Sequence, residues 1–524
     1  MKIRGKLQNG KTAAGWLLLG LGVLMLLRSI LLCFSEDIWY DELFTVGMIE
    51  HPYGELVAFT AQDVHPPLYY CIVKLFCELC KLIVPPVGTV EAAKLVSTIP
   101  YVILLIYSLT FIRKRFGIFV GGLFFFCLMA MPQLSAYTVE IRMYSFALCF
   151  VTAALLHAYG ALHAPDEKKR RLHGAALVLY GLAAAYTQYF ALVAVVMVYF
   201  YALLRILSGK RERLREWFLW VAVSIACYAP WLTILLRQVA AVSESYWIQP
   251  LTWRSLGGCV KFLLKPSFTN DLFNTIFAVA LFCVYAVCFV LCLRKNAGRN
   301  GKWTEQFELA AAGIGILLGL ILFGFVVSFL LRPVFVYRYM LSAMGGFWLC
   351  FVLCLDLLCD GKDRLRTALQ IATVLFLLVI GLRDYRAFMG EEEYKALLMK
   401  DTQEALAEFG EDDVILYNFD QVQMVTAYYM ENATECLWGG EPERLIQDIL
   451  QTSCEITSLG DVEDAERISQ IRDWLAGGRR VWFVGSFNSR DEIVETMRSA
   501  GLTVEEKGSY FLERYWFNLY SIPF

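Results

Sequence analysis

Charged residues are scarce in this chain. Asp, Glu, Lys and Arg together make up 18% of its 524 residues, and 58% of the residues are hydrophobic. Soluble domains usually carry about a quarter charged residues. The net charge of −2 provides no basic excess, so a nucleic-acid-binding function is not expected. These deficits exclude an ordinary soluble protein and indicate an integral membrane protein.

Metal-binding spacing and internal repetition are also missing. Cys77 and Cys80 form one C-x-x-C pair, but no second pair completes a zinc site, and most other cysteines lie inside apolar runs. Only Cys436 and Cys454 fall in a polar segment, where they could pair if that segment is outside the cytoplasm. No repeat is found, whereas carriers are often built from repeated halves. The sequence therefore gives no support to a repeat-built carrier.

Apolar runs long enough to cross a bilayer, which takes about 17–25 residues, occur about eleven times. They lie near 13–34, 95–112, 117–132, 145–163, 174–188, 190–207, 217–236, 272–293, 307–331, 339–358 and 367–382. Basic clusters such as 113–115 and 168–171 separate them and mark cytoplasmic loops. The run 67–84 is predicted to be a helix lying in the outer leaflet, because a crossing there would place every later basic loop outside. The first run has no cleavage site and is expected to be an uncleaved anchor.

This topology predicts a polytopic α-helical membrane domain, 1–382, followed by an extracytoplasmic domain, 383–524. Residues 35–94 form a large first outer loop that contains the membrane-lying helix. Strand-like and helix-like runs alternate after residue 383, at 414–417, 421–430, 463–476, 481–484 and 510–520. This alternation predicts a small soluble α/β domain with a partly parallel sheet.

Unusual polar residues gather on the predicted outer side. The first outer loop contains Asp41 and Glu42 within Trp-Tyr-Asp-Glu, and Asp63 and His65 within Asp-Val-His-Pro-Pro. An Asp at the centre of a membrane helix costs roughly 2.5–3.5 kcal/mol on insertion scales. Because acids near a membrane are costly, their presence indicates a functional role. Later outer turns add further candidates: Glu140, Arg142 and Tyr144, then Gln188, then Tyr337, Arg338 and Tyr339.

This placement suits the transfer of a sugar from a lipid phosphate. The lipid tail would stay in the bilayer and the phosphate at the interface, where an arginine offers two parallel hydrogen bonds. The lipid phosphate is a good leaving group, whereas an acceptor hydroxyl is hardly ionised at neutral pH. A carboxylate that takes the hydroxyl proton contributes roughly 10²–10⁴-fold. One base and one displacement invert the anomeric centre.

Five motifs in order make the chain resemble the bacterial C-type glycosyltransferases (GT-C fold). The nearest group is that of the protein O-mannosyltransferases and lipid A aminoarabinose transferases, a glycosyltransferase family 39-like superfamily. The resemblance covers about 13–382, and its motifs are W-Y-D-E from Trp39, D-x-H-P-P-L-Y-Y from Asp63, E-x-R-M-Y from Glu140, Y-T-Q-Y-F from Tyr186 and Y-R-Y from Tyr337. It implies a catalytic acid in the first outer loop and a polyprenyl-phosphate-linked sugar donor.

The resemblance implies that Asp41 is the general base and that Glu42 orients it or touches the acceptor. Together with charge and membrane side, it assigns substrate binding to Asp63, His65, Glu140, Arg142, Tyr144, Gln188, Tyr337, Arg338 and Tyr339. Arg142 and Arg338 are the expected ligands of the phosphate or the pocket. Relatives often have His at the position of Gln188 and differ in metal use, so a divalent metal stays open.

Simpler roles also stay open. Asp63 fits the N-cap of a helix starting at Pro66, Glu140 fits a partner for Arg142, and the arginines fit interface anchors. For the whole chain we predict an inverting glycosyltransferase of the bacterial cytoplasmic membrane, acting outside on a glycan, lipid or protein acceptor. The alternatives are a glycolipid carrier without transfer chemistry and a scaffold for the C-terminal domain.

Overall fold

The chain forms two compact units. The computed structural model describes residues 2–84, 86–242, 248–297, 303–358 and 363–524. We call 1–33, 63–69 and 94–389 the helical unit, and 34–62, 70–93 and 390–524 the sheet unit. Most of the first outer loop therefore groups with the C-terminal segment rather than with the membrane helices.

Nine helical segments in the described ranges are long and apolar enough to cross a membrane. The first two are α1 (Lys2–Leu32) and a run made of α5 (Thr89–Val96), α6 (Ile99–Tyr107), the π-helix η1 (Ser108–Ile112) and α7 (Arg113–Phe116). The others are α10 (Tyr144–Leu162), α12 (Tyr189–Leu207), α13 (Leu214–Val242), α15 (Asp271–Ala297), α16 (Glu305–Leu330), η4 with α17 (Tyr337–Met340 and Leu341–Leu358) and α18 (Arg364–Leu406). The protein is thus a polytopic α-helical membrane protein, as predicted.

All eleven predicted runs are helical, but two are short. Helix α8 (Ile118–Ala130) has 13 residues, and α11 (Glu167–Ala185) begins with a charged turn that shortens its apolar part. The run predicted to lie in the membrane surface is α4 (Leu68–Ile83), which has only 16 residues. The predicted basic loops at 294–302 and 362–366 fall partly outside the described residues.

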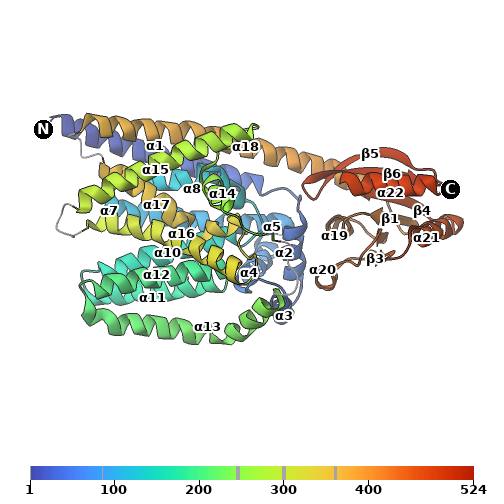
Figure 1. The fold of residues 1–524 in the computed structure, drawn as a ribbon, viewed down its shortest axis with the longest axis horizontal. Coiled ribbons are helices and arrows are strands. Elements are labelled where there is room, and N and C mark those ends of the chain that lie inside the picture. The colour runs from blue at the N-terminus through green and yellow to red at the C-terminus, as the bar shows by residue number, and fades with distance from the viewer. Residues whose placement is uncertain (1, 85, 243–247, 298–302, 359–362) are drawn as a thin grey trace. The chain divides into compact units, whose positions relative to one another are not determined.

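Helices α10 and α17 are the most buried spans of the helical unit, with 94% and 89% of their apolar windows inside the protein. Glycines permit close crossings, because a Cβ on Gly345 of α17 would collide with the Thr152 hydroxyl of α10. A Cβ on Gly313 of α16 would likewise collide with the Gly346 carbonyl group. Small residues at helix crossings are usual where lipid supplies no hydrophobic driving force. These crossings hold together the long helices drawn side by side in Figure 1.

The sheet unit contains an α/β domain on a six-stranded sheet of order β3-β2-β1-β4-β6-β5. Strands β1 (Asp413–Tyr417), β2 (Thr434–Leu437), β3 (Glu455–Ser458) and β4 (Arg480–Gly485) are parallel, and β5 (Glu505–Leu512) and β6 (Tyr515–Ile522) form an antiparallel hairpin. Helices α19 (Asp420–Tyr429), α20 (Arg444–Ile449), α21 (Asp464–Ala476) and α22 (Phe487–Ser499) connect the strands (Figure 1). The partly parallel sheet is confirmed, and the run 510–520 proves to be parts of two strands.

The first-loop helices α2 (Tyr40–Glu50) and α3 (Tyr53–Gln62) belong to the same unit. A Cβ on Gly47 would lie 2.9 Å from Ile449 Cγ2, and His51 Nε2 lies 2.8 Å from the Ile449 carbonyl oxygen. The Tyr429 hydroxyl donates to the Glu36 carbonyl oxygen at 2.6 Å. Helix α2 is therefore built against α19 and α20.

The two cysteines of the polar segment do not pair. Cys436 and Cys454 are separate buried thiols, and their sulfurs lie near the carbonyl oxygens of Leu437 and Met430. The disulfide considered from the sequence is absent, because each thiol lies in the packed interior near a backbone acceptor.

Candidate functional site

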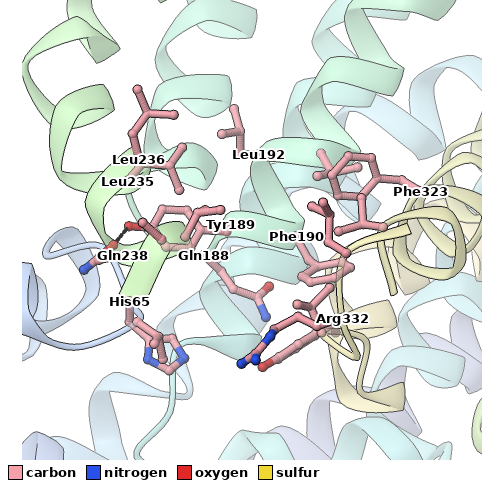
Figure 2. A pocket seen from close by; sticks show the side chains of 18 residues that line it. His65, Gln188, Tyr189, Phe190, Leu192, Leu235, Leu236, Gln238, Phe323 and Arg332 are labelled. Carbon is pink, nitrogen blue, oxygen red and sulfur yellow. Dashed lines mark hydrogen bonds between the residues drawn. The ribbon is translucent and has the colours of Figure 1, made fainter. Parts of the chain in front are cut away.

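An apolar cavity of about 570 Å³ lies in the helical unit. Its walls come from α12, α13 and α16 and include Leu192, Val193, Leu235, Val239 and Phe323. Figure 2 shows the side chains of Leu192, Leu235 and Phe323 among them. Their size and character suit a hydrocarbon chain rather than a polar solute.

The polar end of the cavity is formed by His65, Gln188 and Arg332, whose nitrogen atoms lie on the same side of the cavity in Figure 2. Gln188 precedes α12 in extended conformation and is 3% exposed. Within the described residues, neither atom of its amide has a hydrogen-bond partner. A buried amide without partners is costly, so a ligand at this end would satisfy it.

A hydrogen-bond network fixes the segment that carries His65. His65 Nδ1 lies 2.9 Å from the Asp63 carboxylate, and the Gln238 amide donates to the Asp63 carbonyl oxygen. The Tyr189 hydroxyl donates to Gln238 and accepts from Trp231 Nε1 at 3.0 Å. The network ties the chain before α4 to α12 and α13, and it orients the imidazole at the cavity.

The N-cap interpretation of Asp63 is wrong. Helix α4 begins at Leu68, too far along the chain for Asp63 to be its N-cap, and the Leu68 amide donates to the Tyr186 carbonyl oxygen at 3.0 Å. The Asp63 carboxylate instead contacts His65 in the bend that precedes the helix.

Other predicted binding residues form a second cluster in the helical unit. The Arg338 guanidinium lies 5.7 Å from the centre of the Tyr144 ring, and the rings of Tyr137 and Tyr144 are 5.2 Å apart. Arg142 is 4% exposed, and its amide donates to the Glu140 carbonyl oxygen at 2.8 Å. The Tyr144–Arg338 contact joins the third and fifth motifs.

Only some of the predicted binding residues line the cavity. His65, Gln188 and Tyr339 line the cavity, and Tyr339 stacks on Phe190 with ring centres 4.6 Å apart. Tyr337 instead stacks on Phe262 at 6.4 Å. The residues that do not line the cavity are Asp63, Glu140, Arg142, Tyr144, Tyr337 and Arg338.

The two predicted catalytic acids lie in the first turn of α2, in the sheet unit. A carboxylate at a helix N-terminus is stabilised by the helix dipole. The Glu42 carboxylate is 5% exposed and accepts from the Trp39 amide at 3.3 Å, so it caps its own helix. Asp41 is half-buried. This arrangement gives Glu42 a structural bond, and the role of Asp41 as a base stays a prediction.

Tyr40 connects this turn to other carboxylates. Its hydroxyl donates to Glu443 at 2.7 Å and its amide donates to Glu513 at 2.6 Å. Burial, followed by the neighbouring Glu443 charge, raises the pKa of the Tyr40 hydroxyl. Burial also raises the pKa of Glu513 to about 7, with a further contribution from Asp41. Tyr40 thus donates two hydrogen bonds, one from its amide and one from its neutral hydroxyl.

Sequence reasoning placed Arg332 at an outer turn but assigned no binding role to it, nor to Gln238 or Glu513. Arg332 follows the long apolar helix α16 directly, so its charge at a predicted outer end was an available signal. Gln238 and Glu513 stand in no recognisable motif, and only the fold shows their contacts. In the described residues, no three His, Cys, Asp or Glu side chains are grouped in a way that could hold a metal ion.

Comparisons with known proteins identify the fold. No protein-family model matches the sequence, and no curated protein sequence matches it. The crystal structure of ArnT from Cupriavidus metallidurans in the apo state is similar, with a TM-score of 0.59, 11% identity, and coverage of 97% of this chain and 98% of that chain. The structure of ArnT bound to undecaprenyl phosphate gives a TM-score of 0.59 and 12% identity over the same shares. The chain therefore has the ArnT fold, as the predicted resemblance required.

Proposed function

We propose that this protein transfers a sugar from a polyprenyl phosphate to an acceptor outside the bacterial cytoplasmic membrane. The observation that carries the proposal is the apolar cavity whose polar end holds His65, Gln188 and Arg332. The fold of the chain is that of ArnT, and one structure of ArnT is bound to undecaprenyl phosphate. The basic loops support a topology in which the first outer loop and the C-terminal domain are extracytoplasmic.

The cavity matches the two halves of such a donor. Its leucine, valine and phenylalanine side chains would cover isoprenoid units. At the other end, the Arg332 guanidinium would donate to phosphate oxygens, and the Gln188 amide would gain the partner that it lacks among the described residues. Charge-assisted hydrogen bonds of this kind contribute roughly 1.5–3 kcal/mol each.

The reaction would be a single displacement. The Asp41 carboxylate takes the proton of the acceptor hydroxyl, whose oxygen forms a bond to the anomeric carbon. The bond from that carbon to the phosphate oxygen breaks, and its electron pair leaves with the polyprenyl phosphate. Because attack and departure occur on opposite faces, the anomeric configuration inverts. Glu42 would keep the turn of Asp41 in place through its bond to the Trp39 amide.

Identification of the lipid that co-purifies with the protein tests the donor class. Mass spectrometry should find a polyprenyl phosphate, or show that it binds after incubation with undecaprenyl phosphate. The Arg332→Ala and Gln188→Leu proteins should retain about a tenth of it or less, if each loses one polar bond worth about 1.4 kcal/mol or more. Arg237→Ala is the matched control, because Arg237 is exposed and does not line the cavity.

Three outcomes would contradict the proposal or a part of it. Equal retention of lipid by the Arg332→Ala and Arg237→Ala proteins would remove Arg332 from the phosphate site. Failure of every protein to bind a polyprenyl phosphate would remove the donor class. A wild-type protein that binds the lipid-linked sugar but never cleaves it would instead be a carrier.

A further inference from the structure

The turn of the β5–β6 hairpin has an unfavourable backbone for its sequence. Glu513 and Arg514 are its two central residues, and their φ angles are +48° and +63°. Two-residue hairpins with positive φ at both positions strongly prefer Asn-Gly or Asp-Gly. Side chains with a Cβ are strained there, and such strain persists where the surroundings impose it.

Both side chains of the turn contact the start of α2. The Glu513 carboxylate accepts from the Tyr40 amide at 2.6 Å, and Glu513 is 9% exposed. The Arg514 guanidinium lies 3.8 Å from the centre of the Trp39 ring, within the range of a cation–π interaction. An Asn-Gly turn would make the hairpin more favourable but would supply neither contact. The unusual residues are therefore explained by α2 rather than by the hairpin.

The contacted residues directly precede the predicted base. Tyr40 is the first residue of α2 and Asp41 is the second. The first amides of a helix have no partner inside the helix, so Glu513 supplies the acceptor that the Tyr40 amide needs. The charged groups acting on Glu513 are Asp41 and Glu42 of α2 and Arg514 of its own turn. A shift of this turn would move the carboxylate of Asp41 with it.

We propose that the Glu513–Arg514 turn is a positioning element for Asp41, so that the C-terminal domain takes part in transfer by holding the first turn of α2. The inference rests on the proposed function for its catalytic consequence. Its structural half, the anchoring of residues 39–42, does not depend on any reaction. Glu513 and Arg514 are positioning residues, since they act through Trp39 and Tyr40.

The test replaces the turn by its preferred sequence, Glu513→Asn with Arg514→Gly, in the full chain in lipid nanodiscs. The replacement relieves the backbone strain, so the apparent melting temperature should stay equal or rise. Amide hydrogen exchange of residues 40–43 should accelerate at least tenfold, because the acceptor of the Tyr40 amide is gone. The kcat for transfer should fall about tenfold or more, while the KM for the lipid donor stays within twofold.

Two further variants separate positioning from general damage. Glu513→Gln keeps an oxygen acceptor for the Tyr40 amide, so it should restore slow exchange and most of kcat. Glu505→Gln changes an exposed carboxylate at the other end of β5 and should behave as wild type. Unchanged exchange, or unchanged kcat, in the Asn-Gly protein would overturn the inference. If the wild-type protein transfers no sugar, the proposed function fails, whereas hydrogen exchange still decides whether the turn anchors α2.

Discussion

The helical unit and the sheet unit hold different parts of the predicted chemistry. All of the predicted binding residues lie in the helical unit, where three of them line an apolar cavity. Both predicted catalytic acids lie in the sheet unit, at the N-terminus of α2. The proposed function thus places the lipid in the helical unit and the base in the sheet unit. The difference teaches that the C-terminal segment is part of the fold that carries the acids, rather than an appended tail.

Two buried acids, Glu308 of the helical unit and Glu435 of the sheet unit, also have different surroundings. Glu308 at the start of α16 is 2% exposed and contacts Arg205 at 2.8 Å, His163 at 3.1 Å and the Tyr201 hydroxyl at 2.9 Å. Glu435 on β2 accepts from the Thr426 hydroxyl at 3.2 Å, and burial raises its pKa to about 8. Glu308 is thus paired with an arginine, whereas Glu435 is bonded to a neutral hydroxyl and burial raises its pKa.

Removing the proposed base should have the largest effect. The Asp41→Asn protein should lose roughly 10²–10⁴-fold in the rate of transfer, because its amide cannot accept the hydroxyl proton. Rates measured with a purified lipid-linked donor, beside lipid occupancy and melting temperature, check this. Glu50→Gln is the control, since Glu50 is the exposed last residue of the same helix. A wild-type rate in the Asp41→Asn protein would remove the base from the sheet unit.

Breaking the charge cluster of the helical unit should be next in size. The Glu308→Ala change would remove the buried partner of Arg205 and of the Tyr201 hydroxyl, at a cost of roughly 1–3 kcal/mol. Thermal unfolding in detergent should show a clear fall in melting temperature. Glu212→Ala, which removes an exposed acid, provides the control. Equal melting temperatures would show that these contacts do not stabilise the helical unit.

Filling the cavity should weaken lipid binding more modestly. A Val193→Trp protein should bind undecaprenyl phosphate about tenfold more weakly, which corresponds to ~1.4 kcal/mol. Val193 lines the cavity, whereas Leu179 of α11 is 65% exposed, so Leu179→Trp is the control. Titration of the lipid into both proteins measures the difference. If both bind equally, the hydrocarbon lies elsewhere.

The smallest expected effect concerns pH and Glu435. Its folded-state pKa is raised to about 8 from 4.5, so the folded protein holds this proton more tightly than the unfolded chain. The stability that this group provides is therefore complete below about pH 4.5 and declines as pH rises toward 8. The difference between the melting temperatures of the Glu435→Gln and wild-type proteins should shift in favour of the variant as pH rises from 6 to 8. Above pH 8 the difference should stay constant. A constant difference would show that Glu435 is already ionised at pH 6.

The helical unit was the more predictable of the two. Apolar runs must be helical in a membrane because backbone groups have no water to bond, so hydropathy alone located its helices. Only α8 and α11 fell short of the expected length. The cavity was harder to predict from the sequence. Arg332 and Gln238 come together there only because α12, α13 and α16 pack against one another. His65 and Gln188 were found because they stand in motifs.

The sheet unit was predicted in outline only. Buried strands such as β1 and β4 can be predicted from their consecutive apolar residues. Strands β2 and β3 are harder to predict, because each has four residues of mixed composition. The β5–β6 turn carries neither Asn nor Gly, so its sequence gave no hairpin signal. The same feature hid Glu513 and its contact with Tyr40. Turn preferences therefore failed to predict the hairpin, because its turn residues contact a segment that is distant in the sequence.

The most direct test of the whole account is the fate of a lipid-linked sugar offered to the purified protein in nanodiscs. Wild-type protein supplied with an acceptor extract should release free polyprenyl phosphate in step with glycosylated product, and the Asp41→Asn protein should bind the same donor without releasing it. Binding without release by the wild type, under the same conditions, would contradict a transferase and leave a carrier.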